Sequence, residues 1–580
     1  MKILLMAVNA KYIHTNPAIY SLKAYAGQIV DRQIDIVEYT INHRREEILS
    51  DLYRRSPNLL AVSCYIWNWE LVCALLKEIP KILPQTEIWL GGPEVSYHPE
   101  QVLAQFPMVK GIMTGEGEQT FRELAKGREE LSDISGIVYR QDGIVRTRER
   151  EPMELSKIPF LYNDLSAFAN KIIYYESSRG CPYRCSYCLS SIDKTVRFRD
   201  LEMVKRELQF FLDKRVPQVK LVDRTFNCNH HHALEIWRYL LEHDNGVTNF
   251  HFEIEADILS EEELSLLARM RPGLMQMEIG VQTTNPESLQ EIRRHGDMER
   301  LREVVMRIRQ AHNIHIHLDL IAGLPFEDYD SFAQSFNEVY AMQPQQLQLG
   351  FLKVLKGSHM YDMADSYGMQ YLSMPPYEVL STRWLPYEKV LCLKEVEEMV
   401  EIYYNSGQFR ASMSLLQKVY PDAFSLYEAL AAFCQKEGYM ANAQARVSRY
   451  QALMEFMMTT MLADREDLCR EVLTYDYYLR ENVKSSPPFA PAEDEEIRTE
   501  SKKRLRAFYI MEEAEYKNLP AYGGYDSRQM SKMTHGEIFW YPVWEESLTP
   551  ETKPWEEPAI LVFDYRTRDP LTYEARTVFV

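Results

Sequence analysis

Three cysteines within eight residues are the strongest chemical signal in this sequence. Cys181, Cys185 and Cys188 follow a strand-like run and lie in a loop marked by Gly180 and Pro182. A [4Fe–4S] cluster has four irons, and each needs a thiolate or a substitute ligand. Because one loop with three cysteines can hold three irons and leave the fourth open, we predict an iron–sulfur cluster at this loop.

Other uses of these cysteines fit less well. A structural zinc site usually takes four protein ligands in two separated pairs, and the sequence contains no second cysteine pair. Three is an odd number and nothing suggests secretion, which argues against disulfides. The nine cysteines are otherwise scattered singly, which suits a reducing cytoplasm and leaves a chance cluster as the remaining alternative.

Length and charge limit the classes of function. The 580 residues are enough for several domains, and a hydrophobic content of 46% is enough for real cores. The formal net charge of −19 argues against a broad nucleic-acid-binding face. We expect the basic runs Arg293-Arg294 and Lys502-Lys503-Arg504 to be solvated helix faces. No apolar run is long enough for a membrane span or a signal peptide, so we expect a cytoplasmic protein.

Regular alternation of short apolar runs with amphipathic stretches characterises residues 1–150. This pattern predicts a doubly wound, Rossmann-like parallel sheet, which binds ligands at the carboxyl ends of its strands. A hairpin is predicted within residues 128–165, followed by a linker at Pro152 and Pro159. The predicted strands are 3–8, 34–39, 59–64, 88–90 and 111–113, and the predicted helices are 18–30, 69–79 and 99–105.

Six further strand-like runs alternate with helical stretches over residues 165–370. They predict a partial (β/α)6 barrel of the TIM type, in which catalytic groups gather at the carboxyl ends of the strands. The cysteine loop follows the first of these runs. The predicted strands are 172–176, 219–223, 250–255, 275–281, 314–320 and 347–354.

Polar residues stand at the ends of these otherwise apolar runs, which indicates a binding pocket. By contrast, adjacent histidines on a helix point in different directions, so we interpret His230, His231 and His232 as the start of a helix. The polar residues at the strand ends are Asp223, Glu253, Glu255, Glu278, Gln282 and Asp319.

Residues 371–580 have a different texture. Leu, Met, Tyr and Phe recur at helical spacing, so we expect a mainly helical domain of unknown role that caps the barrel or selects substrate. A proline-rich linker at 485–491 precedes three short strands. The predicted helices are 395–405, 409–419, 424–436, 440–458 and 465–478, and the predicted strands are 538–541, 560–565 and 577–580.

The cysteine spacing, with Tyr187 just before the last cysteine, resembles the signature of radical S-adenosylmethionine (SAM) enzymes. In that family the open iron is chelated by SAM, and an electron from the cluster cleaves SAM to a 5′-deoxyadenosyl radical. The resemblance implies an external electron donor such as flavodoxin or ferredoxin. It also implies that Glu255 and Gln282 bond the ribose or the amino-acid end of SAM, and that Arg293 or Arg294 pairs with its carboxylate. Ile321 and Gly323 would present backbone to adenine.

The first domain resembles the cobalamin-binding domain that precedes the barrel in one class of these enzymes. The resemblance implies that Ser63 and the loop through Asn68 face the corrin or its tail. An Asp-x-His-x-x-Gly motif is missing from the first turn, where His14 is the nearest candidate, so we expect cobalt without a protein histidine. The alternative is a domain that kept the fold and lost the cofactor. Further residues implied near the nucleotide tail are Gly91, Gly92, Val95, Gly115 and Glu116.

The resemblance as a whole implies an α/β protein of three domains with boundaries at 1–150, 165–370 and 371–580. Its implied activity is cobalamin-dependent methylation of an unactivated carbon of a small molecule or biosynthetic intermediate, through the deoxyadenosyl radical and methylcobalamin. Two alternatives stay open. One is a radical rearrangement, cyclisation or reduction without methyl transfer, and the other is a cobalamin or redox sensor without catalysis. The sequence does not identify the substrate or the oligomeric state.

Overall fold

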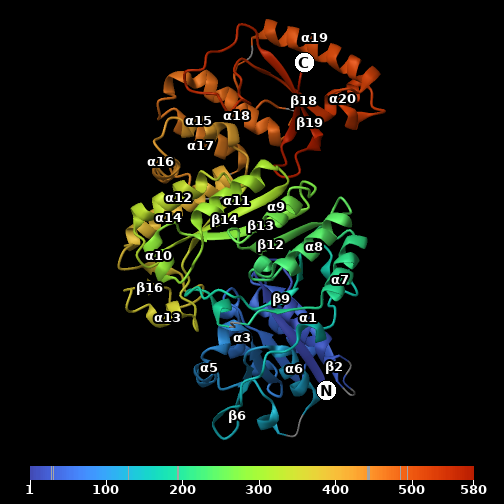
Figure 1. The fold of residues 1–580 in the computed structure, drawn as a ribbon, viewed down its shortest axis with the longest axis vertical. Helices are drawn as coiled ribbons and strands as arrows, with labels where there is room; N and C mark the ends of the chain where they lie inside the picture. The colour runs from blue at the N-terminus through green and yellow to red at the C-terminus, as the bar shows by residue number, and fades with distance from the viewer. Residues whose placement is uncertain are drawn as a thin grey trace.

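The computed structural model describes the chain from residue 1 to 580 except residues 28, 30, 31, 128, 129, 193, 194, 441–444, 484 and 493. The predicted helix end at residue 30 and the stretch 441–444 therefore lie outside the described residues. Figure 1 shows the N-terminal sheet at one end of an elongated molecule, the barrel in the middle and the C-terminal region at the other end. In the described part of the chain, every helix is too short or too polar to cross a membrane.

The first sheet has the strand order β2-β1-β3-β4-β5-β6-β7, and its first five strands are parallel. Both faces of β1, which lies between β2 and β3, are apolar: Leu4 and Met6 belong to one core and Ile3 and Leu5 to the other. Burial on both faces explains the continuous hydrophobic run in the sequence. The strands are β1 (Lys2–Asn9), β2 (Gln33–Thr40), β3 (Leu59–Ser63), β4 (Glu87–Gly91) and β5 (Val109–Met113).

Helices cover both faces of this sheet, which confirms the doubly wound prediction. Three of them were not predicted: α4 is only four residues long, and α2 and α6 each bury only a narrow apolar stripe among charged residues. The predicted hairpin is present as β6 (Ile137–Arg140) and β7 (Ile144–Arg146), and it extends the sheet by pairing antiparallel with β5. The helices are α1 (Pro17–Ala26), α2 (Arg45–Arg55), α3 (Trp69–Ile82), α4 (Pro93–Ser96), α5 (Pro99–Gln105) and α6 (Gly117–Lys126).

The second sheet has the order β15-β14-β13-β12-β11-β8, with every neighbouring pair parallel. Its two edge strands do not pair with each other, so the barrel is partial, as predicted. Burial alternates strictly along β13: Met277 and Ile279 pack outward into the core, and Glu278 faces the other way. The strands are β8 (Ile173–Tyr175), β11 (Gln218–Leu221), β12 (Asn249–Ile254), β13 (Met275–Gln282), β14 (Ile314–Ala322) and β15 (Gln346–Phe351).

Helices and short strands complete the barrel. The histidine run starts α8, as predicted, where the Asn229 side chain accepts a hydrogen bond from His232 N. The elements are β9 (Ser178–Arg179), β10 (Arg197–Phe198), α7 (Leu201–Asp213), α8 (His230–Glu242), α9 (Glu261–Leu267), α10 (Pro286–Glu291), α11 (Met298–Gln310), α12 (Tyr329–Tyr340), α13 (His359–Met363), β16 (Gln370–Tyr371) and β17 (Val379–Ser381).

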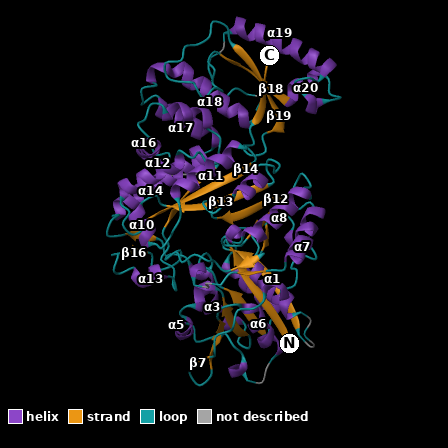
Figure 2. Cartoon of the chain, in the orientation of Figure 1, coloured by secondary structure: helices purple, strands orange, loops and turns teal. Residues whose placement is uncertain are grey.

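Helices dominate the C-terminal region in Figure 2, together with one three-stranded antiparallel sheet. The basic run 502–504 is exposed on α19, as predicted, although α19 itself was not predicted. Asn405 makes two hydrogen bonds of 2.9 Å with the backbone of Leu347 near the start of β15. The elements are α14 (Tyr387–Val400), a π-helical turn (Glu401–Asn405), α15 (Arg410–Gln417), α16 (Ala423–Lys436), α17 (Arg446–Met457), α18 (Glu466–Arg480), α19 (Glu495–Glu515), α20 (Ser527–Met533), β18 (Thr534–Phe539), β19 (Ala559–Arg568) and β20 (Ala575–Phe579).

This attachment places the C-terminal helices at the amino ends of the barrel strands. The opposite, carboxyl ends carry the cysteine loop and face the first sheet (Figure 1). The region therefore closes the end of the barrel away from the cysteines.

Candidate active site

The cysteine loop is held at both of its ends. Its flanking strands β9 and β10 pair with each other, and Gly180 just after β9 has a φ of +104°. A Cβ at Gly180 would lie 2.3 Å from the carbonyl oxygen of Thr195, so the close approach requires glycine. In the middle of the loop, Ser186 N donates to Ile292 O at 2.9 Å and Ser186 O accepts from Met360 N at 2.8 Å. The loop is therefore fixed to the barrel.

The thiols in this loop lie in different surroundings. Cys185 is buried, which raises the pKa of its thiol, and Arg294 Nη1 lies 4.0 Å from its sulfur. Cys181 Sγ lies 3.5 Å from Thr225 Oγ1. All three are free thiols, although no three metal-binding side chains among the described residues already converge on one point. The donor set of three thiols beside one guanidinium suits an iron–sulfur cluster, whose thiolate ligands carry negative charge.

The arginine that faces the cysteines is Arg294. Its Nη2 donates to both carboxylate oxygens of Glu255, at 2.8 and 3.0 Å, and to the carbonyl of Gly280. Burial raises the pKa of Glu255 to about 7 although Arg294 opposes this. The expected solvated face was wrong for Arg294, because Glu255 compensates its buried charge. Arg293 instead points to His359, at 2.9 Å.

The other residues expected around SAM lie at the same end of the barrel. Gln282 has a φ of +73° at a bulge, and its amide lies directly over the Cα of Gly280. Gly323 has a φ of +88°, and a Cβ there would lie 2.7 Å from Val379 Cγ1. Tyr187 and Ile321 pack against the same apolar cluster that contains Val379. Burial raises the pKa of Tyr187, so its hydroxyl stays protonated.

Charged side chains line the inner face of the barrel strands. Glu278 lies 3.0 Å from Lys220 Nζ and 2.9 Å from His251 Nε2. Burial alone would raise its pKa, but the hydrogen bonds from these partners hold the pKa of Glu278 at about 2. His317 Nε2 lies 3.0 Å from Asp319 Oδ1, but neither atom makes a hydrogen bond to a described residue. TIM barrels usually fill this space with branched apolar residues, so a polar interior indicates a binding cavity.

Like the buried atoms Asp319 Oδ1 and His317 Nε2, Glu253 is an unsatisfied member of this set. It accepts no hydrogen bond from any described residue, and its closest cations are Arg224 at 3.8 Å and Lys220 at 4.0 Å. Burial raises the pKa of Glu253 to about 7. Since its side chain is still 24% exposed, Glu253 lines a space that a ligand or water can reach.

Tight backbone geometry shapes the turns of the first sheet. Gly92 has a φ of +111°, and a Cβ there would lie 2.4 Å from Cys64 O. Gly115 has a φ of +70° with open space around it. Ser63 Oγ accepts a hydrogen bond of 2.8 Å from Asn16 Nδ2 and is buried. These turns can therefore approach a ligand closely only through backbone.

Three further residues expected at the nucleotide tail face protein atoms. Val95 is completely buried in the apolar core. A Cβ at Gly91 would lie 3.5 Å from Met113 Cε. Glu116 lies 2.5 Å from Arg197 and 3.3 Å from Arg179. Burial alone would raise the pKa of Glu116, but the hydrogen bond from Arg197 and its other partners lower it. Glu116 therefore joins the first sheet to the barrel.

Sequence reasoning missed this junction. Arg179, directly before the cysteine loop, also pairs with Glu118 at 2.9 Å and with Glu176 at 2.8 Å. On the other side of the first sheet, Lys356 Nζ lies 3.3 Å from Glu94 Oε1. Short-range patterns do not reveal pairs so distant in the sequence.

Aromatic side chains crowd the carboxyl ends of β1 and β3. Tyr65 and Trp67 stack with ring centroids 4.4 Å apart, and Tyr12 and Trp67 remain 66% and 44% exposed. His14 Nδ1 lies 2.6 Å from the hydroxyl of Tyr174 in the barrel, and burial lowers the pKa of His14. Exposed aromatic rings at a sheet edge suit a large, partly apolar ligand. The signal in the sequence was the aromatic composition of the 63–68 turn.

Comparison with protein families divides the chain in the same way. The B12 binding domain matches residues 3–125, the Radical SAM superfamily matches residues 175–339, and a protein family of unknown function, DUF4080, matches residues 365–563.

Two relatives and one solved structure illustrate the similarity. The 2-(S-pantetheinyl)-carbapenam-3-carboxylate methyltransferase of Streptantibioticus cattleyicolor is 28% identical over 304 residues, which cover 48% of this chain and 44% of that protein. The anaerobic magnesium-protoporphyrin IX monomethyl ester cyclase of Synechocystis sp. is 23% identical over 378 residues, which cover 61% and 75%. The cobalamin-dependent S-adenosylmethionine radical enzyme OxsB, with aqua-cobalamin and S-adenosylmethionine bound, aligns over 80% of each chain with a TM-score of 0.58 and 15% identity.

The chain thus spans less than half the length of the carbapenam relative. The likeness to OxsB shows the fold, and it confirms the predicted α/β class with a sheet domain, a barrel and a helical C-terminal region. Successive parts of the chain therefore match the B12 binding domain, the Radical SAM superfamily and DUF4080, in this order.

Proposed function

We propose that this protein is a cobalamin-dependent radical SAM enzyme that methylates an unactivated carbon of a polar small molecule. One observation carries the proposal. The cysteine loop and the aromatic carboxyl edge of the first sheet lie at the same end of the barrel, joined by the ion pairs of Arg179 with Glu116 and Glu118. Two cofactor sites that must act on one substrate have to open toward a shared space.

The residues at each site suit the cofactor assigned to it. Cys181, Cys185 and Cys188 would hold the cluster. Tyr187, Glu255, Gln282, Ile321 and Gly323 would surround SAM, with Arg294 rather than Arg293 as the guanidinium beside it. Ser63, Gly92 and Gly115 would contact cobalamin through the turns, with Tyr65 and Trp67 against its apolar parts. We propose domain boundaries at 1–150, 165–370 and 371–580.

When bound, these cofactors supply an electron, a radical source and a methyl carrier. The residues of the chain position these cofactors. Arg294 lies between Glu255 and Cys185, so it balances charge next to the cluster loop. His14 Nδ1 is hydrogen-bonded to the Tyr174 hydroxyl. This contact holds His14 against the barrel and fits a cobalt without a protein histidine ligand.

The interior of the barrel favours a polar substrate. Glu278 already accepts hydrogen bonds from Lys220 and His251, whereas Glu253 has no hydrogen-bond donor among the described residues. A substrate hydroxyl or amine placed there would donate a hydrogen bond to Glu253. We also propose a cytoplasmic location and an external electron donor of the flavodoxin or ferredoxin type.

A second candidate is radical chemistry without methyl transfer. The similarity to the cyclase favours it, since that alignment covers 75% of the cyclase and 61% of this chain. A sensor that no longer turns SAM over fits less well, because it would not need the buried Glu255–Arg294 pair together with Gln282.

Product analysis separates these functions. The reconstituted protein, loaded with cobalamin and reduced, is incubated with methyl-labelled SAM in a cell extract that supplies substrate. Methyl transfer of this type uses SAM twice, so we expect S-adenosylhomocysteine and 5′-deoxyadenosine together, with label on cobalt first. If 5′-deoxyadenosine accumulates without S-adenosylhomocysteine and without label on cobalt, the methyltransferase proposal is wrong. If neither product rises above that of the Cys185→Ala variant, the chain is a sensor.

A further inference from the structure

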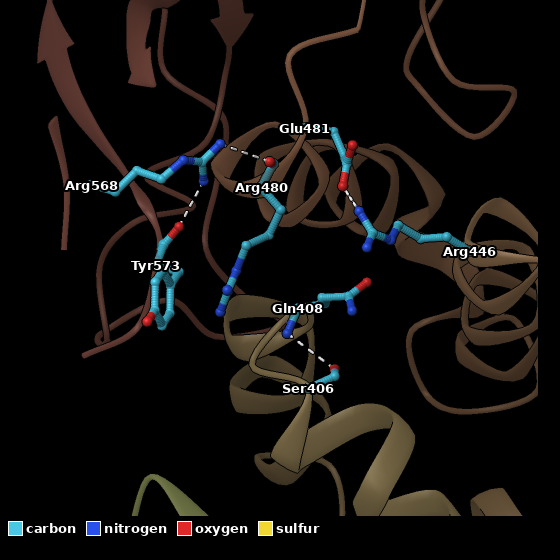
Figure 3. Close-up of a pocket in the computed structure, with 7 residues that line it drawn as sticks. All are labelled: Ser406, Gln408, Arg446, Arg480, Glu481, Arg568 and Tyr573. Carbon is cyan, nitrogen blue, oxygen red and sulfur yellow. Dashed lines mark hydrogen bonds and ion pairs between the residues drawn. The ribbon is translucent and has the colours of Figure 1, made fainter. Parts of the chain in front are cut away.

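A second polar pocket lies in the DUF4080 region, remote from the cysteine loop. It has a volume of about 240 Å³, below the size of most sites for whole drug-sized ligands. Figure 3 shows arginine side chains entering it from three segments: the start of α17, the end of α18 and the end of β19. The lining residues are Ser406, Gln408, Arg446, Arg480, Glu481, Arg568 and Tyr573.

The positive charge in this pocket exceeds the negative charge. Arg446 pairs with Glu481. Arg480 and Arg568 form no ion pair with any carboxylate in the described part of the chain. Arg480 Nη2 donates to Gly407 O at 2.7 Å, and Arg568 donates to the carbonyl oxygens of Tyr573 and Arg480, at 2.7 and 3.1 Å. Two guanidinium charges are therefore left without a counter-charge in contact.

Buried polar atoms in the same place lack partners. Arg480 Nε and Gln408 Oε1 are both buried without a hydrogen-bond partner. Burial lowers the pKa of Arg480, and the positive charges of Arg410 and Arg568 lower it further against the opposing effect of Glu574. An unpaired buried donor is costly, and a bound anion would both accept its hydrogen bond and relieve the repulsion.

We propose that this pocket binds an oxyanion, the phosphate or carboxylate end of a small molecule. Planar guanidinium groups match both kinds of anion by forming two parallel hydrogen bonds. Arg480 Nε has no hydrogen-bond partner, and Arg568 lines the same pocket, where it donates to the carbonyl oxygen of Arg480. The volume holds an anionic head group and excludes a whole nucleotide cofactor.

The competing explanation is that these arginines only tie loops together through backbone carbonyls. It accounts for the three bonds that Arg480 and Arg568 make, but not for the buried, unpartnered Arg480 Nε. It also does not explain why, among the described residues, no carboxylate forms an ion pair with either guanidinium. A purely structural role predicts that phosphate does not bind. The two explanations are therefore distinguishable without substrate or cofactors.

Calorimetric titration of the full chain with inorganic phosphate, and separately with malonate, at constant ionic strength in chloride tests the proposal. We expect saturable binding of one anion per chain. Arg480→Gln and Arg568→Gln should each weaken binding about tenfold or more, which corresponds to about 1.4 kcal/mol. Preference for phosphate identifies a phosphate ester as the ligand class, and preference for malonate identifies a carboxylate.

Arg506→Gln on the exposed face of α19 makes the same charge change in the same region and should leave binding unchanged. If Arg480→Gln does not fold, Arg568→Gln and Gln408→Glu replace it, since a carboxylate at 408 should abolish anion binding. Absence of saturable binding up to about 10 mM of both anions, or equal weakening by Arg506→Gln, overturns the proposal.

Discussion

Arg179, Arg197 and Arg294, at the cysteine end of the barrel, each pair with at least one carboxylate. Arg480 and Arg568, at the opposite end, hydrogen-bond only to backbone carbonyls among the residues that the structure describes. The first three hold the loop, the first sheet and the barrel in position before any ligand arrives. Removing either partner of such a buried pair leaves an uncompensated charge. The positive charges of Arg480 and Arg568 are available to pair with a bound anion.

The difference indicates two ways in which this fold uses guanidinium groups. Where the site must stay organised around a cluster and two cofactors, the charges are neutralised internally. Where a small anion is to bind and dissociate, the arginines have no carboxylate partner. The four predictions that follow test this contrast, beginning with the largest effect.

Replacing Cys181, Cys185 or Cys188 with Ala should abolish the cluster and reductive cleavage of SAM, because two thiolates cannot hold three irons. Iron and sulfide content after anaerobic reconstitution and the yield of 5′-deoxyadenosine measure the effect. Cys392→Ala, in the C-terminal region, is the matched control and should keep both. If any one of these three single variants keeps a normal cluster and normal SAM cleavage, the assignment of the cysteine loop is wrong.

Arg294→Gln should have a much larger effect on stability and on SAM affinity than Arg293→Gln. Arg294 and Glu255 are 14% and 8% exposed, so breaking the pair should lower the free energy of unfolding by about 3 kcal/mol. SAM affinity should also fall. Arg293→Gln should change stability by less than about 0.5 kcal/mol, because Arg293 makes its contact at the surface. Denaturant unfolding measures the stability of both variants, and titration measures their SAM affinity. Equal losses in the two variants would show that the Arg294–Glu255 pair contributes nothing specific to either quantity.

Alanine at Gly92 should be more harmful than alanine at Gly115. Both have positive φ, but only Gly92 also meets a backbone oxygen, Cys64 O. We expect a loss of about 2 kcal/mol for Gly92→Ala and about 1 kcal/mol for Gly115→Ala. Gly92→Ala should in addition weaken cobalamin binding, measured by absorbance on titration. Equal stabilities of the two variants would contradict the close approach of Gly92 to the carbonyl oxygen of Cys64.

Buried aspartates at the two ends should respond to pH in the same direction. Burial raises the pKa of Asp223 to about 6 and of Asp476 to about 7, against their hydrogen bonds from Ser177 and Ser412. Between the ordinary value of 3.8 and these values the unfolded chain loses its proton first. The free energy of unfolding therefore falls as pH rises through this window, and the penalty is complete above it.

Asparagine at either position removes the titrating group. We expect the loss of stability between pH 6 and pH 8 to shrink by about 1 kcal/mol in Asp476→Asn and by less in Asp223→Asn. Guanidinium unfolding at both pH values measures the difference. A loss that stays the same in Asp476→Asn would show that Asp476 is already ionised at pH 6.

Much of the architecture was predictable because its signals are local. The continuous apolar run of β1 indicated a strand buried on both faces, and the alternation along β13 indicated one inward and one outward face. Cys181, Cys185 and Cys188 stand out by spacing alone. The helix α19 was missed because its many charged residues hide the few that it buries, such as Phe508 and Tyr509.

The sequence by itself determined the order of the three regions, the class of each and the chemistry of the cysteine loop, since these depend on residues close together along the chain. Only the tertiary structure decided which arginine faces Glu255, that Glu116 joins the sheet to the barrel, and that Arg446, Arg480 and Arg568 meet in one pocket. Each of these depends on side chains from distant segments. Their pairing is set by how the sheets and helices pack, and no local pattern records it.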